Sequence, residues 1–121
     1  MNDTVLVIED EVIIGELVKI NLKMRQINCT VATTGQEGIE MFESQNPSIV
    51  LLDIRLPDID GWDVCKKIKQ KNPDSIVIFM TAATQVKDHE IAEKVGADDF
   101  IEKPFDVNAL ISIVNKHRKT H

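Results

Sequence analysis

The segment IVLLDIRLPDIDG, residues 49–61, brings an apolar run directly to an acidic residue. Residues 49–52 are apolar, Asp53 ends the run, and turn-forming residues follow: Pro57, Asp58, Asp60 and Gly61. A short apolar run bounded by turn residues is typical of a buried β-strand. The segment therefore predicts a strand whose C-terminal end presents the carboxylate of Asp53.

Three other apolar runs also stop at polar groups. Residues 4–8 lead into Glu9 and Asp10, residues 76–80 into Thr81, and residues 100–101 toward Lys103 and Pro104. If the four runs are parallel strands of one sheet, their carboxyl ends lie along one edge, where open α/β sheets build their ligand sites. The sequence thus predicts one site that combines carboxylates, a hydroxyl and an ammonium group. Such a set suits a divalent metal and a phosphoryl group.

Helical patterns separate the strands. Residues 11–26 are predicted to form an amphipathic helix, because apolar side chains recur there at helical spacing: Val12, Ile13, Leu17, Ile20 and Met24. A strand is expected over 27–32, and a helix from the Thr34–Glu37 capping box to the residue before Pro47. Further helices are expected over 62–71, over about 85–95, and after the capping residue Asp106.

Strands and helices therefore alternate along the chain. Strand cores that are nearly free of polar residues indicate a parallel sheet covered on both faces. We expect a doubly wound, flavodoxin-like α/β fold with five parallel strands in the order 2-1-3-4-5 and five flanking helices. In this order the first and third strands are neighbours, so Glu9, Asp10 and Asp53 should converge.

Length and composition limit what the site belongs to. A chain of 121 residues, 43% of them hydrophobic, suits one domain over residues 1–121. Its 20 acidic residues outnumber 14 Lys and Arg, and the net charge of -6 predicts protein partners rather than nucleic acid. Residues 1–4 lack a signal-peptide start, and no apolar run approaches the ~20 residues that span a bilayer. We therefore expect a cytoplasmic protein without membrane contact.

Cysteine and histidine add little to the predicted chemistry. Cys29 and Cys65 lack CxxC spacing and are expected to be free, buried or half-buried thiols. His89, His117 and His121 share no spacing with other ligands and are expected at the surface.

The expected site has a definite chemistry. Three crowded carboxylates repel one another unless a cation lies among them, and hard oxygen ligands favour Mg²⁺. Lys103 supplies a charged donor and Thr81 a hydroxyl, which together match phosphoryl oxygens. Asp53, alone on the central strand, is the expected nucleophile, because aspartate is a known phosphoryl acceptor.

These residues resemble a known family, the receiver domains of two-component response regulators, and in particular the chemotaxis-regulator type. The match consists of Glu9-Asp10-Glu11, Asp53 in LLDIRLPDIDG, Thr81-Ala82 in FMTAAT, and Lys103-Pro104-Phe105 preceded by GADDF. The motifs occur in the family's order and spacing, and the resemblance covers essentially the whole chain.

The resemblance implies a mechanism for each matching residue. Asp53 would receive a phosphoryl group from the phosphohistidine of a sensor histidine kinase or a phosphotransfer protein. Mg²⁺ would be held by Asp10, Asp53 and the backbone carbonyl of Arg55, with Glu9 acting through a water. Phosphoryl oxygens would be bound by three groups: the Lys103 ammonium, the Thr81 hydroxyl and the Ala82 backbone N–H. As Thr81 moves, Phe100 would turn inward and change the surface of helix 4, strand 5 and helix 5. The domain would catalyse only its own phosphorylation and dephosphorylation and would not be an enzyme otherwise.

Three positions refine these expectations. Phe100 lacks the hydroxyl of the Tyr that many relatives have there, which should favour its inward state. Glu9 stands where Asp is common, without a change of charge. Arg55 and Ala83 flank the path of the attacking water and offer no group to orient it, so we hypothesise slow self-dephosphorylation.

Several alternatives stay open at this point. A Mg²⁺-dependent phosphohydrolase would need an acid at Arg55, a flavin carrier would need a phosphate loop at Glu9 to Glu11, and a degenerate interaction module would lack the acids or the lysine. In simpler interpretations Asp10 only caps a helix, Thr81 is an ordinary strand-end hydroxyl, Lys103 is a solvated cation and Phe100 is a core aromatic. The output is undetermined, and it could be an output domain or a protein target. A homodimer through helix 4, strand 5 and helix 5 is conceivable from the charges of Asp98, Asp99, Lys116, Arg118 and Lys119.

Overall fold

The computed structural model describes residues 2–82 and 86–118. Strands and helices alternate through these residues, as predicted. The strands are β1 (Asn2–Ile8), β2 (Cys29–Ala32), β3 (Pro47–Asp53), β4 (Ile76–Thr81) and β5 (Asp99–Glu102). The helices are α1 (Val12–Met24), α2 (Gly35–Gln45), α3 (Gly61–Lys71), α4 (Val86–Lys94) and α5 (Val107–His117). The predicted boundaries differ from the observed ones by a few residues at most.

The strands form one parallel sheet in the order β2-β1-β3-β4-β5, which confirms the predicted topology. Ile8 is the register partner of Leu52, so Glu9 and Asp53 follow neighbouring positions. Asp53 pairs with Met80, which puts the end of β4 beside the end of β3. The polar residues at the carboxyl ends of β1, β3 and β4 therefore share one edge of the sheet.

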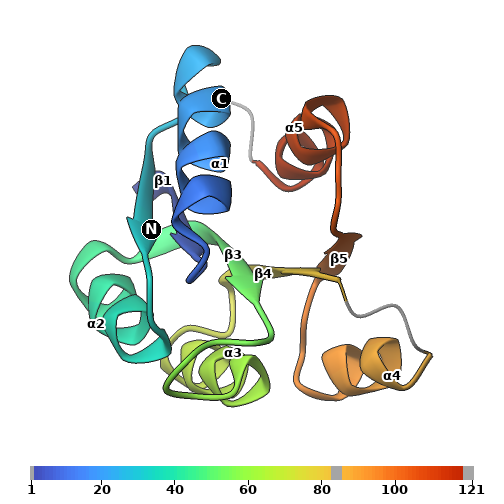
Figure 1. Ribbon diagram of the computed structural model, residues 1–121. Coiled ribbons are helices and arrows are strands. Elements are labelled where there is room, and N and C mark those ends of the chain that lie inside the picture. The colour runs from blue at the N-terminus through green and yellow to red at the C-terminus, as the bar shows by residue number, and fades with distance from the viewer. Residues whose placement is uncertain (1, 83–85, 119–121) are drawn as a thin grey trace.

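Helices cover both faces of the sheet, as Figure 1 shows: α1 and α5 lie on one side, and α2, α3 and α4 on the other. Alternate strand residues point to the two layers, so Val5 and Val7 pack with the α1 and α5 side, and Leu6 and Ile8 with the opposite side. Each layer is a continuous apolar core. The sheet is thus a rigid support for the loops at its carboxyl edge.

The predicted helix α1 is present, but the apolar residues that predicted it do not lie on its buried face. The residues that predicted it are exposed: Val12, Ile13, Leu17, Ile20 and Met24. The buried face carries Gly15, Val18 and Leu22 instead. A Cβ at Gly15 would lie 3.0 Å from Cγ1 of Val31, so this small residue lets α1 pack closely on β2. An apolar stripe is therefore left on the outer side of α1.

Side-chain caps fix the starts of three helices. Thr34 accepts a hydrogen bond from the N–H of Glu37 (3.1 Å), which confirms the predicted cap of α2. Asp106 accepts from the N–H of Ala109 (2.7 Å) at the start of α5, also as predicted. Asp60 caps α3 through the N–H of Trp62 (2.9 Å). These bonds satisfy N–H groups that a helix start leaves without partners.

The prediction for His117 was wrong. Its side chain is only 16% exposed, and Nε2 lies 2.8 Å from Oδ2 of Asp99. Lys116 lies 3.3 Å from the same oxygen, so α5 is tied to β5 within the chain. His89 is exposed, Cys65 is buried and Cys29 is half-buried, as expected, while His121 lies outside the described residues.

Among the residues that the structure describes, no helix has the length and apolar character needed to cross a membrane.

Candidate functional site

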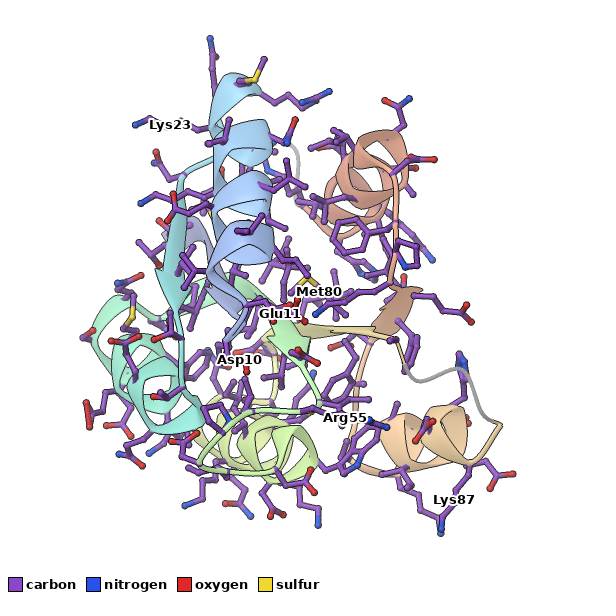
Figure 2. The ribbon with its side chains drawn as sticks, in the orientation of Figure 1. Asp10, Glu11, Lys23, Arg55, Met80 and Lys87 are labelled. Carbon is purple, nitrogen blue, oxygen red and sulfur yellow. The ribbon has the colours of Figure 1, made fainter. Side chains whose placement is uncertain are left out.

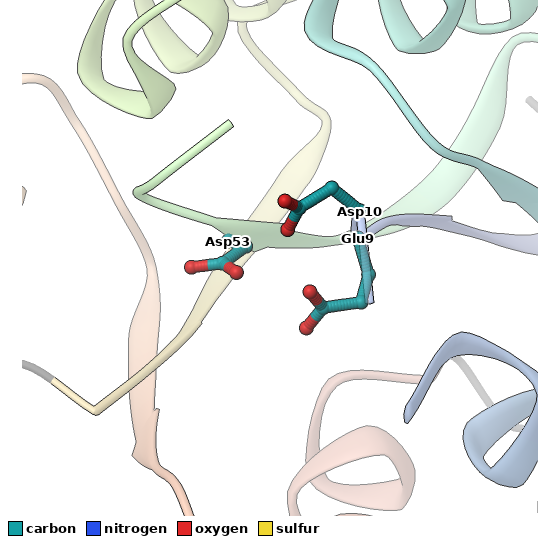
Figure 3. A group of neighbouring side chains, drawn as sticks. All are labelled: Glu9, Asp10 and Asp53. Carbon is teal, nitrogen blue, oxygen red and sulfur yellow. The ribbon is translucent and has the colours of Figure 1, made fainter. Parts of the chain in front are cut away.

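Three carboxylates meet at the carboxyl edge of the sheet. Glu9 and Asp10 follow β1, and Asp53 ends β3; one oxygen from each lies within 4.8 Å of the other two. Figure 3 shows these side chains side by side at the ends of the two strands. The predicted convergence is therefore present in the structure, and it follows from the neighbouring positions of β1 and β3.

The three acids differ in exposure. Glu9 is 0% exposed and Asp53 5% exposed, whereas Asp10 is exposed to solvent. Because a buried carboxylate is costly without a partner, Glu9 and Asp53 need compensation inside the protein. Asp10 forms the open rim of the group.

Lys103 provides that compensation. Its ammonium donates hydrogen bonds to Oε1 of Glu9 and to Oδ2 of Asp53, the latter at 3.1 Å. The ammonium also lies 3.8 Å from Oε1 of Glu11, an acid that the sequence placed in the motif without giving it a role. The loop carrying Lys103 has a cis peptide bond between Lys103 and Pro104. Lys103 therefore lies beside Glu9 and Asp53, as predicted, although these residues are far apart in the sequence.

Backbone N–H groups hold the remaining carboxylate oxygens. Oε2 of Glu9 accepts from the N–H of Glu11 at 3.1 Å. Oδ1 of Asp53 accepts from the N–H of Arg55 at 3.2 Å. Both oxygens of Asp53 therefore have a donor, one from Lys103 and one from the loop that follows β3. These bonds orient the carboxylate of Asp53.

Burial and neighbouring charges shift the pKa values of Glu9 and Lys103. Burial raises the pKa of Glu9 to about 7, and the charge of Asp53 adds to this rise, while the hydrogen bond from Lys103 opposes it. Burial alone lowers the pKa of Lys103, but the hydrogen bond to Glu9 and the charge of Asp53 outweigh it, and the net shift is upward. Lys103 is therefore a cation at neutral pH.

The donor set fits a divalent metal ion. Three carboxylates and one ammonium leave two negative charges without compensation when all are ionised. Carboxylate oxygens are the ligands that Mg²⁺ prefers, and an exposed Asp10 leaves room for the waters that Mg²⁺ retains. This agrees with the Mg²⁺ pocket that the resemblance to receiver domains implies.

The other predicted residues lie around this group. Thr81 ends β4 and pairs with Glu102 of β5, and Ala82 follows it in an exposed position. Arg55 is exposed on the loop after Asp53, and Figure 2 labels it with Asp10 and Glu11 near this edge. The Thr81 side chain and the whole of Ala83 lie outside the described residues.

Phe100 has a neighbour that the sequence did not suggest. It is half-buried on β5, and its ring centroid lies 4.2 Å from that of His89 on α4, with 31° between the ring planes. A core aromatic and a residue that turns inward are both compatible with this position. The contact links α4 to β5.

Comparisons with known proteins agree with the architecture. A parallel sheet of order 2-1-3-4-5 with helices on both faces defines the class of flavodoxin-like α/β domains. A model of the response regulator receiver domain matches residues 5–115. The chain therefore belongs to the receiver domains of two-component response regulators, as the motifs predicted. Neither a phosphohydrolase nor a degenerate module is favoured.

Individual relatives support the same assignment. The chain is 36% identical over 108 residues to "Probable transcriptional regulatory protein TcrX" of Mycobacterium tuberculosis, covering 89% of this chain and 46% of TcrX. It is 32% identical over 117 residues to the alkaline phosphatase synthesis transcriptional regulatory protein PhoP of Bacillus subtilis, covering 94% of this chain and 49% of PhoP. The receiver domain of the Francisella response regulator 1452 superposes with a TM-score of 0.88 at 30% identity, covering 95% of both chains. The chain thus spans about half the length of each of these two regulators.

Proposed function

We propose that the chain, as one domain over residues 1–121, is a signalling switch that receives a phosphoryl group on Asp53. The observation that carries the proposal is the position of Asp53: it is buried at the end of β3, beside the acids after β1 and within hydrogen-bond distance of the ammonium of Lys103. A carboxylate oriented by fixed donors beside a cation is suited to attack a phosphoryl group.

The proposed transfer proceeds in line. A carboxylate oxygen of Asp53 forms the new P–O bond while the P–N bond of a phosphohistidine breaks, and the released imidazole keeps the electron pair and takes up a proton. Lys103 would pair with a phosphoryl oxygen, and Thr81 and the Ala82 N–H would bind others. Because Asp53 and Lys103 already lie together at the carboxyl edge, catalysis would consist mainly of positioning and charge neutralisation. The domain would thus promote only reactions of its own phosphate.

We further propose that Mg²⁺ is held by Asp10, Asp53 and the Arg55 backbone carbonyl, with Glu9 contributing through a water. The ion would neutralise the charge that develops on the phosphoryl oxygens. Glu9 is already bonded to Lys103 and to the Glu11 N–H, which agrees with an indirect role. Arg55 and Ala83 would slow the loss of phosphate because neither orients an attacking water. The half-life of the Arg55→Asn/Ala83→Glu variant measures that effect.

The phosphoryl donor would be a sensor histidine kinase or a phosphotransfer protein that docks beside the site. A surface for it is the apolar stripe on α1, which begins at Val12, two residues after Asp10. Ile13, at 83% exposure, is its most exposed member. Large exposed apolar patches are typical of protein contacts. A charge at Ile13 should therefore slow transfer from a kinase and leave transfer from acetyl phosphate unchanged.

The output would pass through α4, β5 and α5 to an output domain or a protein target. Thr81 and Phe100 would move together when phosphate is bound. A homodimer through this surface is the alternative, but Asp99 is already paired with Lys116 and His117 of its own chain. We propose a cytoplasmic location, as is typical of the family, and no direct contact with nucleic acid or membrane.

The test uses beryllofluoride, which stands in for the phosphoryl group. We expect Mg²⁺ with beryllofluoride to change Trp62 fluorescence in a saturable way, and Asp53→Ala to abolish the change. Asp74→Ala removes an exposed acid before the opposite end of β4 and should respond like the natural chain. Acetyl phosphate should also add one hydroxylamine-labile phosphate, absent from Asp53→Asn. A folded natural chain that binds neither reagent would overturn the proposal.

A further inference from the structure

The loop that follows Asp53 is bonded to the start of α2, the helix that follows β2. Asp58, in the middle of this loop (residues 54–60), accepts two hydrogen bonds from the start of α2: Oδ1 from the N–H of Gly35 at 2.8 Å, and Oδ2 from the N–H of Gln36 at 2.9 Å. The residues joined are 22 and 23 positions apart in sequence. Asp58 is thus a bidentate bridge between two separate segments.

Two side chains accept hydrogen bonds from the N–H groups at the start of α2. Asp58 takes the N–H groups of Gly35 and Gln36, while Thr34 takes that of Glu37. Thr34 is the local cap of α2, since its own backbone leads into the helix. Asp58 satisfies the same helix from outside. Asp58 therefore joins α2 to the loop after β3, whereas Thr34 only caps its own helix.

The other end of the loop is also fixed. The N–H of Gly61 donates to the carbonyl of Ile54 at 2.8 Å. A Cβ at Gly61 would lie 2.4 Å from the carbonyl oxygen of Asp53, so a side chain cannot enter there. The loop closes directly against the strand end that carries Asp53. A shift of the loop would therefore reach Asp53.

The connection to the Asp53 carboxylate is a single hydrogen bond. The N–H of Arg55, three residues before Asp58, donates to Oδ1 of Asp53 at 3.2 Å. The other oxygen of this carboxylate, Oδ2, accepts a hydrogen bond from Lys103. If residues 55–58 move away from α2, the Arg55 N–H changes its aim and Asp53 loses one of these two donors.

We propose that Asp58 is a positioning residue for the site: by bridging to the start of α2 it holds the loop so that the Arg55 N–H keeps the Asp53 carboxylate in the orientation that binds Mg²⁺ and the phosphoryl group. This inference rests on the proposed function of Asp53. Backbone donors from Gln36 and Gly35 lower the pKa of Asp58 below 3.8, so the bridge is anionic at neutral pH. An anion at a helix start is also favoured by the helix dipole.

The test compares Asp58→Ala with Thr34→Ala, because each removes a side-chain cap from α2 and only the first releases the loop. Both variants should have a lower urea midpoint than the natural chain. In metal-free protein, amide hydrogen exchange of Arg55 and Gly61 should accelerate in Asp58→Ala and stay unchanged in Thr34→Ala. With Mg²⁺ alone as the probe, calorimetry should show about tenfold weaker binding for Asp58→Ala, the size typical of groups that orient metal ligands.

Asp58→Asn keeps one acceptor oxygen and should fall between the natural chain and Asp58→Ala in both measurements, which also serves if Asp58→Ala does not fold. Equal exchange at Arg55 and equal Mg²⁺ binding in the Asp58 and Thr34 variants would overturn the inference, because Asp58 would then be a cap and nothing more. If the natural chain itself binds no Mg²⁺, the proposed function of Asp53 fails instead, and the metal-free exchange still decides whether Asp58 holds the loop.

Discussion

At the scale of single residues, Lys103 has to satisfy more than one acid. Glu9 is wholly buried and Asp53 nearly so, and the ammonium of Lys103 bonds to both. Removing one partner of a buried ion pair costs more than the pair itself contributes, because the charge that remains is left in a medium of low dielectric constant. The amine thus supports the fold as well as the site.

We predict that Lys103→Met lowers the free energy of unfolding by about 3 kcal/mol in Mg²⁺-free buffer at neutral pH or above. The reason is that Glu9, without its cation, must either keep a buried charge or bind a proton that the unfolded chain does not bind at this pH. Urea unfolding measures the change, and adding Glu9→Gln to Lys103→Met should restore much of the loss. Lys116→Met, which breaks an exposed pair with Asp99, should cost no more than about 1 kcal/mol. Equal losses for Lys103→Met and Lys116→Met would contradict the prediction.

At the scale of elements, one carboxylate of β5 binds two side chains of α5. Oδ2 of Asp99 lies 2.8 Å from His117 and 3.3 Å from Lys116, and Oδ1 accepts from the N–H of Phe100 at 2.9 Å. Burial alone would raise the pKa of Asp99, but these partners outweigh it and hold the pKa below 3.8. The folded state therefore prefers the ionised form more than the unfolded state does.

This shift predicts a stability difference that depends on pH. A carboxylate with a depressed pKa in the folded state stabilises above its unfolded value of 3.8, and the contribution disappears as the pH falls through the lower folded value. Asp99→Asn should therefore lower the free energy of unfolding by about 1 kcal/mol at pH 7, and this loss should decrease gradually below pH 3.8. Urea midpoints along an acid series measure it. Asp63→Asn, from an exposed pair with Lys66, is the control; a cost for Asp99→Asn that is constant with pH would refute the assignment.

At the scale of the whole molecule, the strand ends were predictable because they depend on local pattern and on chain topology. Apolar runs located β1, β3 and β4, and the order 2-1-3-4-5 then brought Glu9 to Asp53. The outward face of α1 was not predictable from periodicity, because a helix with two apolar faces is oriented by close packing at Gly15. Asp58 was predicted only as a turn former, because its hydrogen bonds to α2 form between segments that meet only in the folded protein. His117 likewise shows a role only when β5 reaches α5.

Long-range effects in this molecule should be visible at His89, which lies outside the acidic site but stacks on Phe100. The two ring centroids are 4.2 Å apart and the planes differ by 31°, so the phenyl ring current should shield the imidazole protons. α4 is held mainly by Ala92 and Val95 with half-buried Ile91, which makes it a weakly anchored element. A change at Phe100 should therefore reach His89 without unfolding the domain.

If Phe100 turns inward when the site is filled, the imidazole loses its stacking partner and its proton resonances should move downfield. One-dimensional proton NMR follows this readily, because the chain has only three histidines. Mg²⁺ with beryllofluoride should produce the shift at His89, assigned with His89→Gln, and leave His117, on the Asp99 side of α5, much less affected. In Phe100→Leu the His89 signals should start downfield and stay there on addition of beryllofluoride. Saturable binding reported by Trp62 with His89 resonances unmoved would show that Phe100 keeps its place, and that any signal leaves the site by another route.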